Sequence, residues 1–142
     1  MNPLKIFKIF NLIPLFAVLL IIYLGMMVSG VTFLSTAEPM FSVTLVSEAV
    51  WSPTMSDLLI ILGVVFLYVE IFKSTRTGTT SIIEHGISMG TFLAFLIIFL
   101  TVKDAGSSTF LILTLMSLLD VVGGFTVTIS TARRDWGGGH AH

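Results

Sequence analysis

Four long apolar runs follow one another along the chain. They cover residues 12–34, 55–72, 82–102 and 109–131, and most of the charged residues lie near or between their ends. Each run is close to the roughly 20 residues that an α-helix needs to cross the apolar core of a bilayer. The pattern therefore predicts an all-α membrane protein, in which a bundle of four transmembrane helices forms a single integral membrane domain over residues 1–142.

The first run permits two interpretations. It follows Lys5 and Lys8, as a signal-peptide core follows a basic start, and Ser35-Thr36-Ala37 would serve as a cleavage site. The run is about 23 residues long, however, whereas a signal-peptide core has roughly 7–15. We therefore expect a retained anchor helix with Pro14 in its first turn, where the missing N–H costs little.

The segment at residues 35–54 is the one sizeable connection between apolar runs. Apolar and hydroxyl residues alternate from Phe41 to Leu45, which is the period of a half-buried strand, and Ser47-Glu48 offers a turn before Trp51. A partly extended external loop, with the form of a short hairpin, is predicted. It would either cover the bundle as an irregular cap or dock a partner as a strand.

Polar residues mark the starts of the second and third runs. Ser52-Pro53 offers a cap for the second helix, with Asp57 near its positive end. Ser81-Ile82-Ile83-Glu84 has the capping-box pattern, so the third helix is expected to begin there.

The cations predict the orientation in the membrane. Six of the seven Lys and Arg residues fall on one side if the chain crosses four times, and Lys103 falls on the other. Because cytoplasmic loops carry an excess of Lys and Arg, both termini are expected in the cytoplasm, with the protein in a bacterial inner membrane. The six are Lys5, Lys8, Lys73, Arg76, Arg133 and Arg134. Trp51, Arg133, Arg134 and Trp136 are predicted interfacial anchors.

Composition narrows the function. Apolar residues make up 55% of the chain, charged residues 11%, and the net charge of −1 gives no basic surface for nucleic acid. The chain has no cysteine, which excludes disulfides, thiolate-bound metals and a thiol nucleophile. His85 is the one histidine within an apolar run, so a bis-histidine haem cannot be built in one chain. With no hydrolase or phosphate-loop motif, we expect no enzyme activity, metal or cofactor.

Asp120 is the polar group that most needs explanation, because it lies at the centre of the fourth run. Polar and small residues recur around it at intervals of three or four, which places them on one helix face: Thr114, Ser117, Asp120, Gly124, Thr128 and Thr131. An ionised carboxylate at the bilayer centre costs about 2.5–3.5 kcal/mol, so we expect a neutral acid facing protein. Tyr23, Thr91 and Ser117 are the expected hydrogen-bond partners. The acid is either a proton or cation site or a structural link between helices.

A second group of ionisable residues is expected near the cytoplasmic end of the bundle. Lys73 follows Glu70 by three residues and can reach it, and the short turn over residues 73–80 brings Glu84 and His85 close by. The group would form either an inner vestibule leading to Asp120 or an ion-pair network that holds two helices together.

Small residues predict close helix packing. Gly86, Gly90 and Ala94 are spaced by four residues, the pattern that lets two helices approach closely in a membrane. This face would lie inside the bundle or form a contact between subunits. Gly63, Gly123 and Gly124 are further predicted packing positions.

Three segments carry a resemblance to known sequences: residues 57–78, 120–128 and 132–135. They resemble a set of small bacterial four-helix inner-membrane proteins to which no activity is attached. The resemblance covers the last three runs and implies topology only. Small multidrug exporters also have four helices, but their essential acid lies in the first span, which has no acid here.

Two functions follow from these observations. The favoured one is a non-enzymatic accessory or self-assembling subunit, with the lipid bilayer and a homo-oligomer or larger membrane-protein complex as partners. The alternative is a proton-coupled transport or conductance element in which Asp120 exchanges a proton and Glu70 and His85 line the inner path. The absence of an evident broken helix or internal repeat weighs against the alternative.

Overall fold

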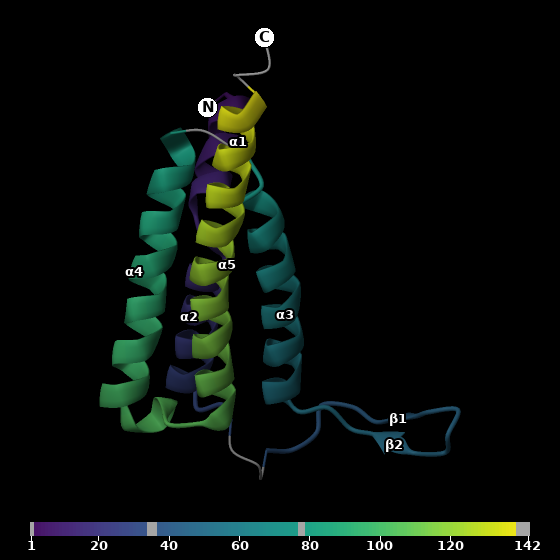
Figure 1. Cartoon of the computed structure of the whole chain (residues 1–142). Coiled ribbons are helices and arrows are strands. Elements are labelled where there is room, and N and C mark those ends of the chain that lie inside the picture. The colour runs from purple at the N-terminus through teal and green to yellow at the C-terminus, as the bar shows by residue number, and fades with distance from the viewer. Residues whose placement is uncertain (1, 34–36, 77–78, 139–142) are drawn as a thin grey trace.

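The computed structural model describes residues 2–33, 37–76 and 79–138. Over these ranges the chain is all-α apart from one small hairpin, as predicted (Figure 1). The helices are α1 (Pro3–Leu12), α2 (Leu15–Val28), α3 (Met55–Lys73), α4 (Thr79–Thr101), the short 3₁₀ helix η1 (Lys103–Ala105) and α5 (Ser108–Gly138). The strands are β1 (Val43–Thr44) and β2 (Val50–Trp51).

Helices α2 to α5 lie side by side as a bundle (Figure 1). α5 packs against α3 and α4, and α2 packs against the same two helices. α3 and α5 run in one direction and α2 and α4 in the other. We call the end that holds α1 and the last turns of α5 the terminal end, and the end that holds η1 and the two strands the hairpin end.

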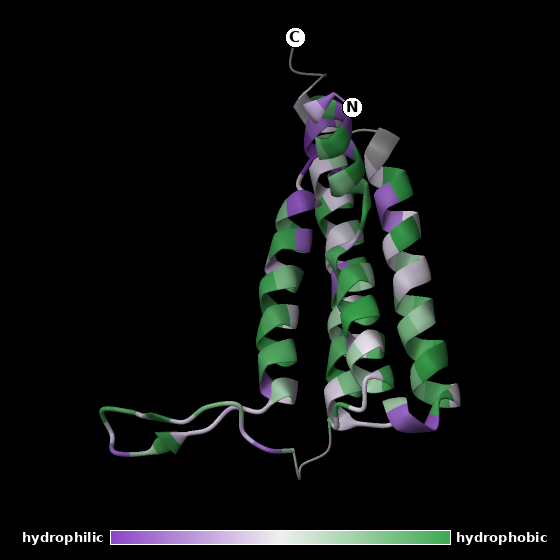
Figure 2. Ribbon diagram, turned by 180° about the vertical axis from the view of Figure 1, so that it is seen from behind, coloured by the Kyte–Doolittle hydropathy of each residue, from purple (hydrophilic) through white to green (hydrophobic). Residues whose placement is uncertain are grey.

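The long helices have the length and composition of membrane spans. Stretches of 18 residues within α3, within residues Ser81–Thr101 of α4 and within α5 have mean hydropathies of 2.2, 1.8 and 2.1. Apolar residues make up most of the length of these helices (Figure 2). α1 and α2 together would make a fourth span, but they are bent by 74° where they meet. In the described ranges the chain therefore has three candidate spans, or four if the bent pair is one span.

The prediction of one continuous helix over residues 12–34 is wrong. The helix breaks between α1 and α2, because Ile13 precedes Pro14 and takes an extended conformation, which a residue before proline favours. Pro14 is the N-cap of α2 rather than part of its first turn. α2 ends at Val28, and the predicted end of the span at Leu34 lies outside the described residues.

The other helix ends also differ from the predicted ones. α3 is capped by Thr54 and Asp57, whose side chains each accept from the other's backbone N–H, so the cap lies two residues beyond Ser52. α4 begins at Thr79, and Ser81 is therefore within the helix rather than at its cap. α5 stays helical to Gly138, beyond the predicted end at residue 131.

The predicted hairpin is present. Val43 pairs with Trp51 and Thr44 with Val50 in an antiparallel ladder, and Glu48 takes a φ of 64° in the turn. The hairpin extends sideways from the start of α3 and does not cover the end of the bundle (Figure 1). The interpretation as a cap is therefore wrong, whereas partner docking stays a prediction.

Packing in the half of the bundle nearer the hairpin end is apolar and aromatic. Tyr23 stacks on Phe33 with ring centroids 4.2 Å apart, and it meets the edge of Phe110 at 4.8 Å. Phe95 contacts Phe110 at 5.3 Å and Phe16 at 6.5 Å. These rings fill the interior of the bundle in the half nearer the hairpin end.

Candidate functional site

Most of the buried polar side chains gather in the other half of the bundle, nearer the terminal end, whereas Ser107, Thr109 and Thr114 are buried nearer the hairpin end. Helical spacing brings those of the terminal half to one face of each helix. They are Glu70 and Ser74 on α3, Ser81, His85, Ser88 and Thr91 on α4, and Ser117 and Asp120 on α5.

The helix register brings Glu70 and Asp120 to the same level. α3 and α5 run in parallel, and Gly123 of α5 lies against Ile71, since a Cβ there would be 3.5 Å from the Ile71 side chain. Glu70 is one residue before Ile71, and Asp120 is less than one turn before Gly123. The chain therefore places two acids from neighbouring helices at one depth in the bundle.

A small cavity joins these groups. It has a volume of about 10 Å³, enough for the centre of about one water molecule or small cation. The three predicted proton or ion candidates, Glu70, His85 and Asp120, all line it. Its full lining is Glu70, Lys73, Ser74, Glu84, His85, Ser88, Asp120 and Gly124. The sequence did not predict Ser74 and Ser88 as members of the site, although Ser88 shares the face of His85 at a spacing of three.

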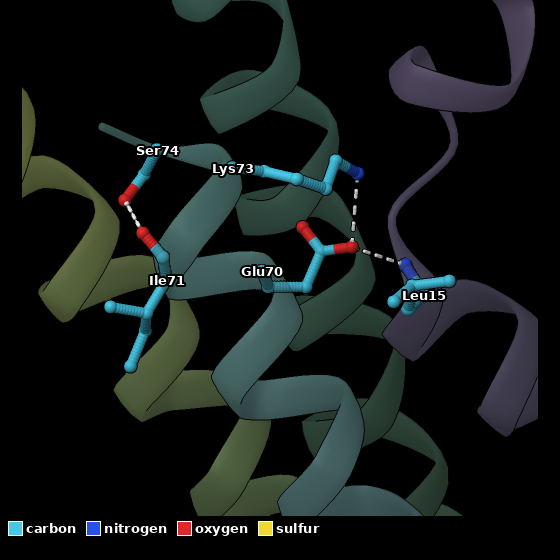
Figure 3. Close-up of polar contacts among 5 residues, drawn as sticks. All are labelled: Leu15, Glu70, Ile71, Lys73 and Ser74. Atoms are coloured by element: carbon cyan, nitrogen blue, oxygen red, sulfur yellow. Dashed lines mark hydrogen bonds and ion pairs between the residues drawn. The ribbon is translucent and has the colours of Figure 1, made fainter. Parts of the chain in front are cut away.

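Glu70 links α3 to the start of α2 (Figure 3). Its Oε1 accepts a hydrogen bond from the Leu15 N–H at 2.7 Å and from Lys73 Nζ at 3.1 Å. Leu15 is the first residue of α2, so the carboxylate lies at the positive end of that helix. The predicted pair with Lys73 is present and largely buried, with 7% of Glu70 and 16% of Lys73 exposed. Glu70 is thus a paired group that fixes the break between α1 and α2.

Asp120 is in the opposite situation. Only 5% of the residue is exposed, and among the described residues its Oδ2 has no hydrogen-bond partner. The Ser117 hydroxyl, one turn away, is likewise buried without a partner there. Leaving a buried polar group unsatisfied costs about 1–3 kcal/mol. Asp120 therefore offers a free carboxyl oxygen to whatever enters the cavity.

His85 is held against α5. Its Nε2 lies 2.7 Å from Thr128 Oγ1 and 3.3 Å from Ser81 Oγ, and its ring stacks on Phe125 at 4.9 Å. Gly124 allows this approach, because a Cβ at that position would be 2.9 Å from His85 Cε1. Gly124, one helical turn after Asp120, thus allows the His85 side chain to reach the cavity.

The predicted hydrogen bonds to Asp120 are not formed. The Tyr23 hydroxyl pairs with Ser107 Oγ at 2.9 Å, and the Thr91 hydroxyl donates to the carbonyl of Ile87 at 2.9 Å. Tyr23 packs on Phe110, which precedes Asp120 by ten residues, or about 15 Å along a helix. Tyr23 lies too near the hairpin end to reach Asp120, because α2 begins at the level of Glu70 and Tyr23 is eight residues further along it.

The predicted packing positions fall into two groups. A Cβ at Gly63 would be 2.9 Å from the side chains of Leu113 and Met116, so Gly63, like Gly124, lies in a close helix contact. Ala94 is partly buried against the core, and Gly123 makes ordinary contacts. At Gly86 and Gly90 a Cβ would meet nothing within 4 Å.

The predicted anchors lie on the surface. Trp51 is in the hairpin, 43% exposed, and Trp136 is in the last turns of α5, 79% exposed. Arg133 and Arg134 are exposed in the same part of α5. The anchors thus occupy both ends of the bundle.

No protein-family model, curated protein or solved structure matches this chain. The resemblance to small bacterial inner-membrane proteins therefore stays a prediction. Within the described ranges, no group of three metal-ligating side chains is arranged to hold a metal ion. The chemistry available in the cavity is that of a carboxyl oxygen without a partner, beside a paired acid and a histidine, which can take up a proton or a small monovalent cation.

Proposed function

We propose that the protein is a proton-coupled transport or conductance element of a membrane, in which Asp120 binds and releases a proton or a small monovalent cation. The observation that supports the proposal most is the free Oδ2 of Asp120 in a cavity that Glu70 and His85 also line. A structural acid that only links helices would be expected to use its buried oxygens in hydrogen bonds.

The broken first helix adds support. Discontinuous helices with their ends near the middle of the bundle are typical of ion and substrate sites in transporters. Here the break is nearer the terminal end: the start of α2 lies beside Glu70, one turn before the end of α3, and Glu70 lines the cavity. The chain thus has a helix break beside the cavity, which the sequence pattern did not reveal.

The path would open at the terminal end only. The cavity lining reaches the end of α3 at Lys73 and Ser74 and the first turns of α4 at Glu84 and His85. Towards the hairpin end, the rings of Phe95 and Phe110 close the bundle. Loading and release would therefore occur from the terminal side unless the aromatic half rearranges or a partner completes the path.

The six cations listed above belong to the terminal end, so we place this end in the cytoplasm of a bacterial cell. The cavity would then be loaded from the cytoplasm, with the hairpin outside the inner membrane.

The test is ion flux in proteoliposomes that contain the purified full chain. A pH gradient without sodium tests proton movement, and a sodium gradient at equal pH tests the cation. Asp120→Asn keeps the shape and the polar groups but removes the exchangeable proton, so flux should fall to the level of empty vesicles. The matched control is Asp104→Asn in η1, at the other end of the bundle, which should keep full flux.

Unchanged flux with Asn at position 120 would refute the proposal, provided that the variant unfolds at the same temperature as the parent protein. Flux driven by the sodium gradient alone would assign the site to the cation rather than the proton.

A second candidate is an accessory or self-assembling subunit. The observation that favours it is the face of α4 that carries Gly86 and Gly90, which is open to the outside of the bundle. Such a face allows another helix to pack at close distance in a membrane. Gly90→Leu would separate the copies if this face is the contact, and Ile97→Leu on the same exposed side is the conservative control. A monomer in lipid nanodiscs, with no co-purifying protein, would contradict this candidate.

A further inference from the structure

α1 is an amphipathic helix whose apolar side is left largely exposed by the described residues. None of its side chains is buried. Pro3, Ile6, Phe7 and Phe10 recur at the spacing of one helix face, and the last three are 45%, 63% and 72% exposed. Lys5 and Lys8 lie together on the opposite side. A short helix of this kind suits a boundary between an apolar medium and water.

The position of α1 matches such a boundary. The chain bends by 74° between α1 and α2. α2 runs along the bundle (Figure 1), so this bend turns α1 across the bundle axis at the terminal end. The surface of a bilayer around the bundle would be perpendicular to the bundle axis and therefore parallel to α1. α1 contacts α4 but is not enclosed by the bundle.

The charge of the terminal end indicates the kind of surface that α1 meets. This end carries six Lys and Arg residues against three carboxylates besides Asp120, namely Glu70, Glu84 and Asp135. Glu70 is already paired with Lys73. The remaining charge is positive, which attracts anionic phospholipid headgroups.

We propose that α1 lies flat in the membrane surface on the terminal side, with Phe7 and Phe10 among the acyl chains and Lys5 and Lys8 at anionic phospholipid headgroups. This is the arrangement of surface-bound amphipathic helices, whose affinity adds apolar burial to electrostatic attraction. The joint at Pro14 connects this helix to Leu15 and hence to Glu70. Lipid-bound α1 therefore holds the start of α2 beside the cavity. The proposal does not depend on the ion site.

The absence of cysteine from the chain allows a direct test, because one introduced cysteine is the only thiol. The full chain with Phe10→Cys is reconstituted in vesicles of phosphatidylcholine mixed with phosphatidylglycerol, and labelling by a water-soluble maleimide is timed. Gly137→Cys, on the exposed last turn of α5, gives the rate for a position in water. Phe7→Cys is the second variant if Phe10→Cys fails to fold.

We expect labelling at position 10 to be much slower than at position 137 in the mixed vesicles, and faster in vesicles of phosphatidylcholine alone. Each lysine near an anionic surface contributes about 1 kcal/mol, so adding Lys8→Gln should speed labelling about fivefold in the mixed vesicles. Lys103→Gln, which removes a cation at the hairpin end, should leave the rate unchanged.

Equal labelling rates at positions 10 and 137 would show that α1 is in water and would overturn the proposal. Slow labelling that responds neither to phosphatidylglycerol nor to Lys8→Gln would also overturn it. In that case, disulfide cross-linking between copies at position 10 would show that a second copy of the chain, rather than lipid, covers the apolar side of α1.

Discussion

The two halves of the bundle are built from the same helices but on different principles. Nearer the hairpin end, the rings of Tyr23, Phe95 and Phe110 fill the interior and close it. Nearer the terminal end, the same helices turn hydroxyls, two acids and a histidine inward around a small cavity. Apolar packing stabilises a bundle at no cost in unsatisfied polar groups, whereas the unpartnered oxygen of Asp120 destabilises it. The apolar half therefore accounts for the fold, and the polar half requires a functional explanation.

The largest effect on stability is expected in the apolar half. Phe110 is fully buried and contacts three other rings. Phe110→Ala should lower the free energy of unfolding by about 3–5 kcal/mol, because it removes packing and leaves a cavity. Unfolding in mixed micelles measures this loss, and Leu119→Ala on the exposed side of α5 is the control. Equal losses at both positions would mean that the ring cluster is not the core.

Breaking the link at Glu70 should have the next largest effect. Glu70→Ala removes the acceptor for the Leu15 N–H and leaves Lys73 unpaired in a largely buried place. Loss of one partner of a buried pair costs about 3 kcal/mol. Glu70→Gln keeps an acceptor for Leu15 and should lose less. If both variants were as stable as the parent protein, Glu70 would not hold the helix break together.

Substitutions at two glycines, one in each half, allow a direct comparison of how rigidly the two halves are packed. Gly124→Ala places a Cβ 2.9 Å from the His85 ring, and Gly63→Ala places one 2.9 Å from the ends of the Leu113 and Met116 side chains. The ring is held by two hydroxyls, whereas the ends of Leu and Met side chains can move. Gly124→Ala should therefore cost about 1–3 kcal/mol, and Gly63→Ala less. Thermal unfolding of the two variants side by side checks the order, and the reverse order would place the rigid contact in the apolar half.

The smallest expected change has the opposite sign. Asp120→Leu replaces a buried acid that lacks a partner with an apolar side chain of similar size, so the bundle should gain about 1 kcal/mol while losing ion binding. Thr114→Val, a change at a hydroxyl that donates to the Phe110 carbonyl of its own helix, is the control. A clear loss of stability in Asp120→Leu would indicate that the acid links helices, as the structural interpretation requires.

The sequence predicts those parts of the fold that depend on residue composition and on the regular spacing of apolar and polar residues. The apolar runs gave the long helices, and alternation from Phe41 to Leu45 gave the hairpin. The polar face through Ser117, Asp120 and Gly124 is buried as its spacing indicated. These features depend on local pattern, which a single chain contains.

The remainder depends on contacts between distant segments. Pro14 fits both the first turn of a helix and a break before it, and the choice is made by Glu70, 55 residues further on, which binds the Leu15 N–H. The predicted hydrogen bond between Tyr23 and Asp120 fails for the same reason, because a helix that begins at Leu15 carries Tyr23 away from Asp120. The approach of His85 to Gly124 depends on the register of two helices, for which the sequence carries no local signal.

The most direct test is whether Asp120 exchanges a proton within the folded protein. Infrared difference spectra between acid and alkaline conditions detect the C=O band of a protonated carboxyl group. Glu70, Lys73, Glu84 and His85 also line the cavity, so the assignment depends on the change seen with Asp120→Asn. We predict a band that disappears as the pH rises and is missing from Asp120→Asn. A carboxyl band from Asp120 that stays constant across the whole pH range in which the protein is folded would contradict the account.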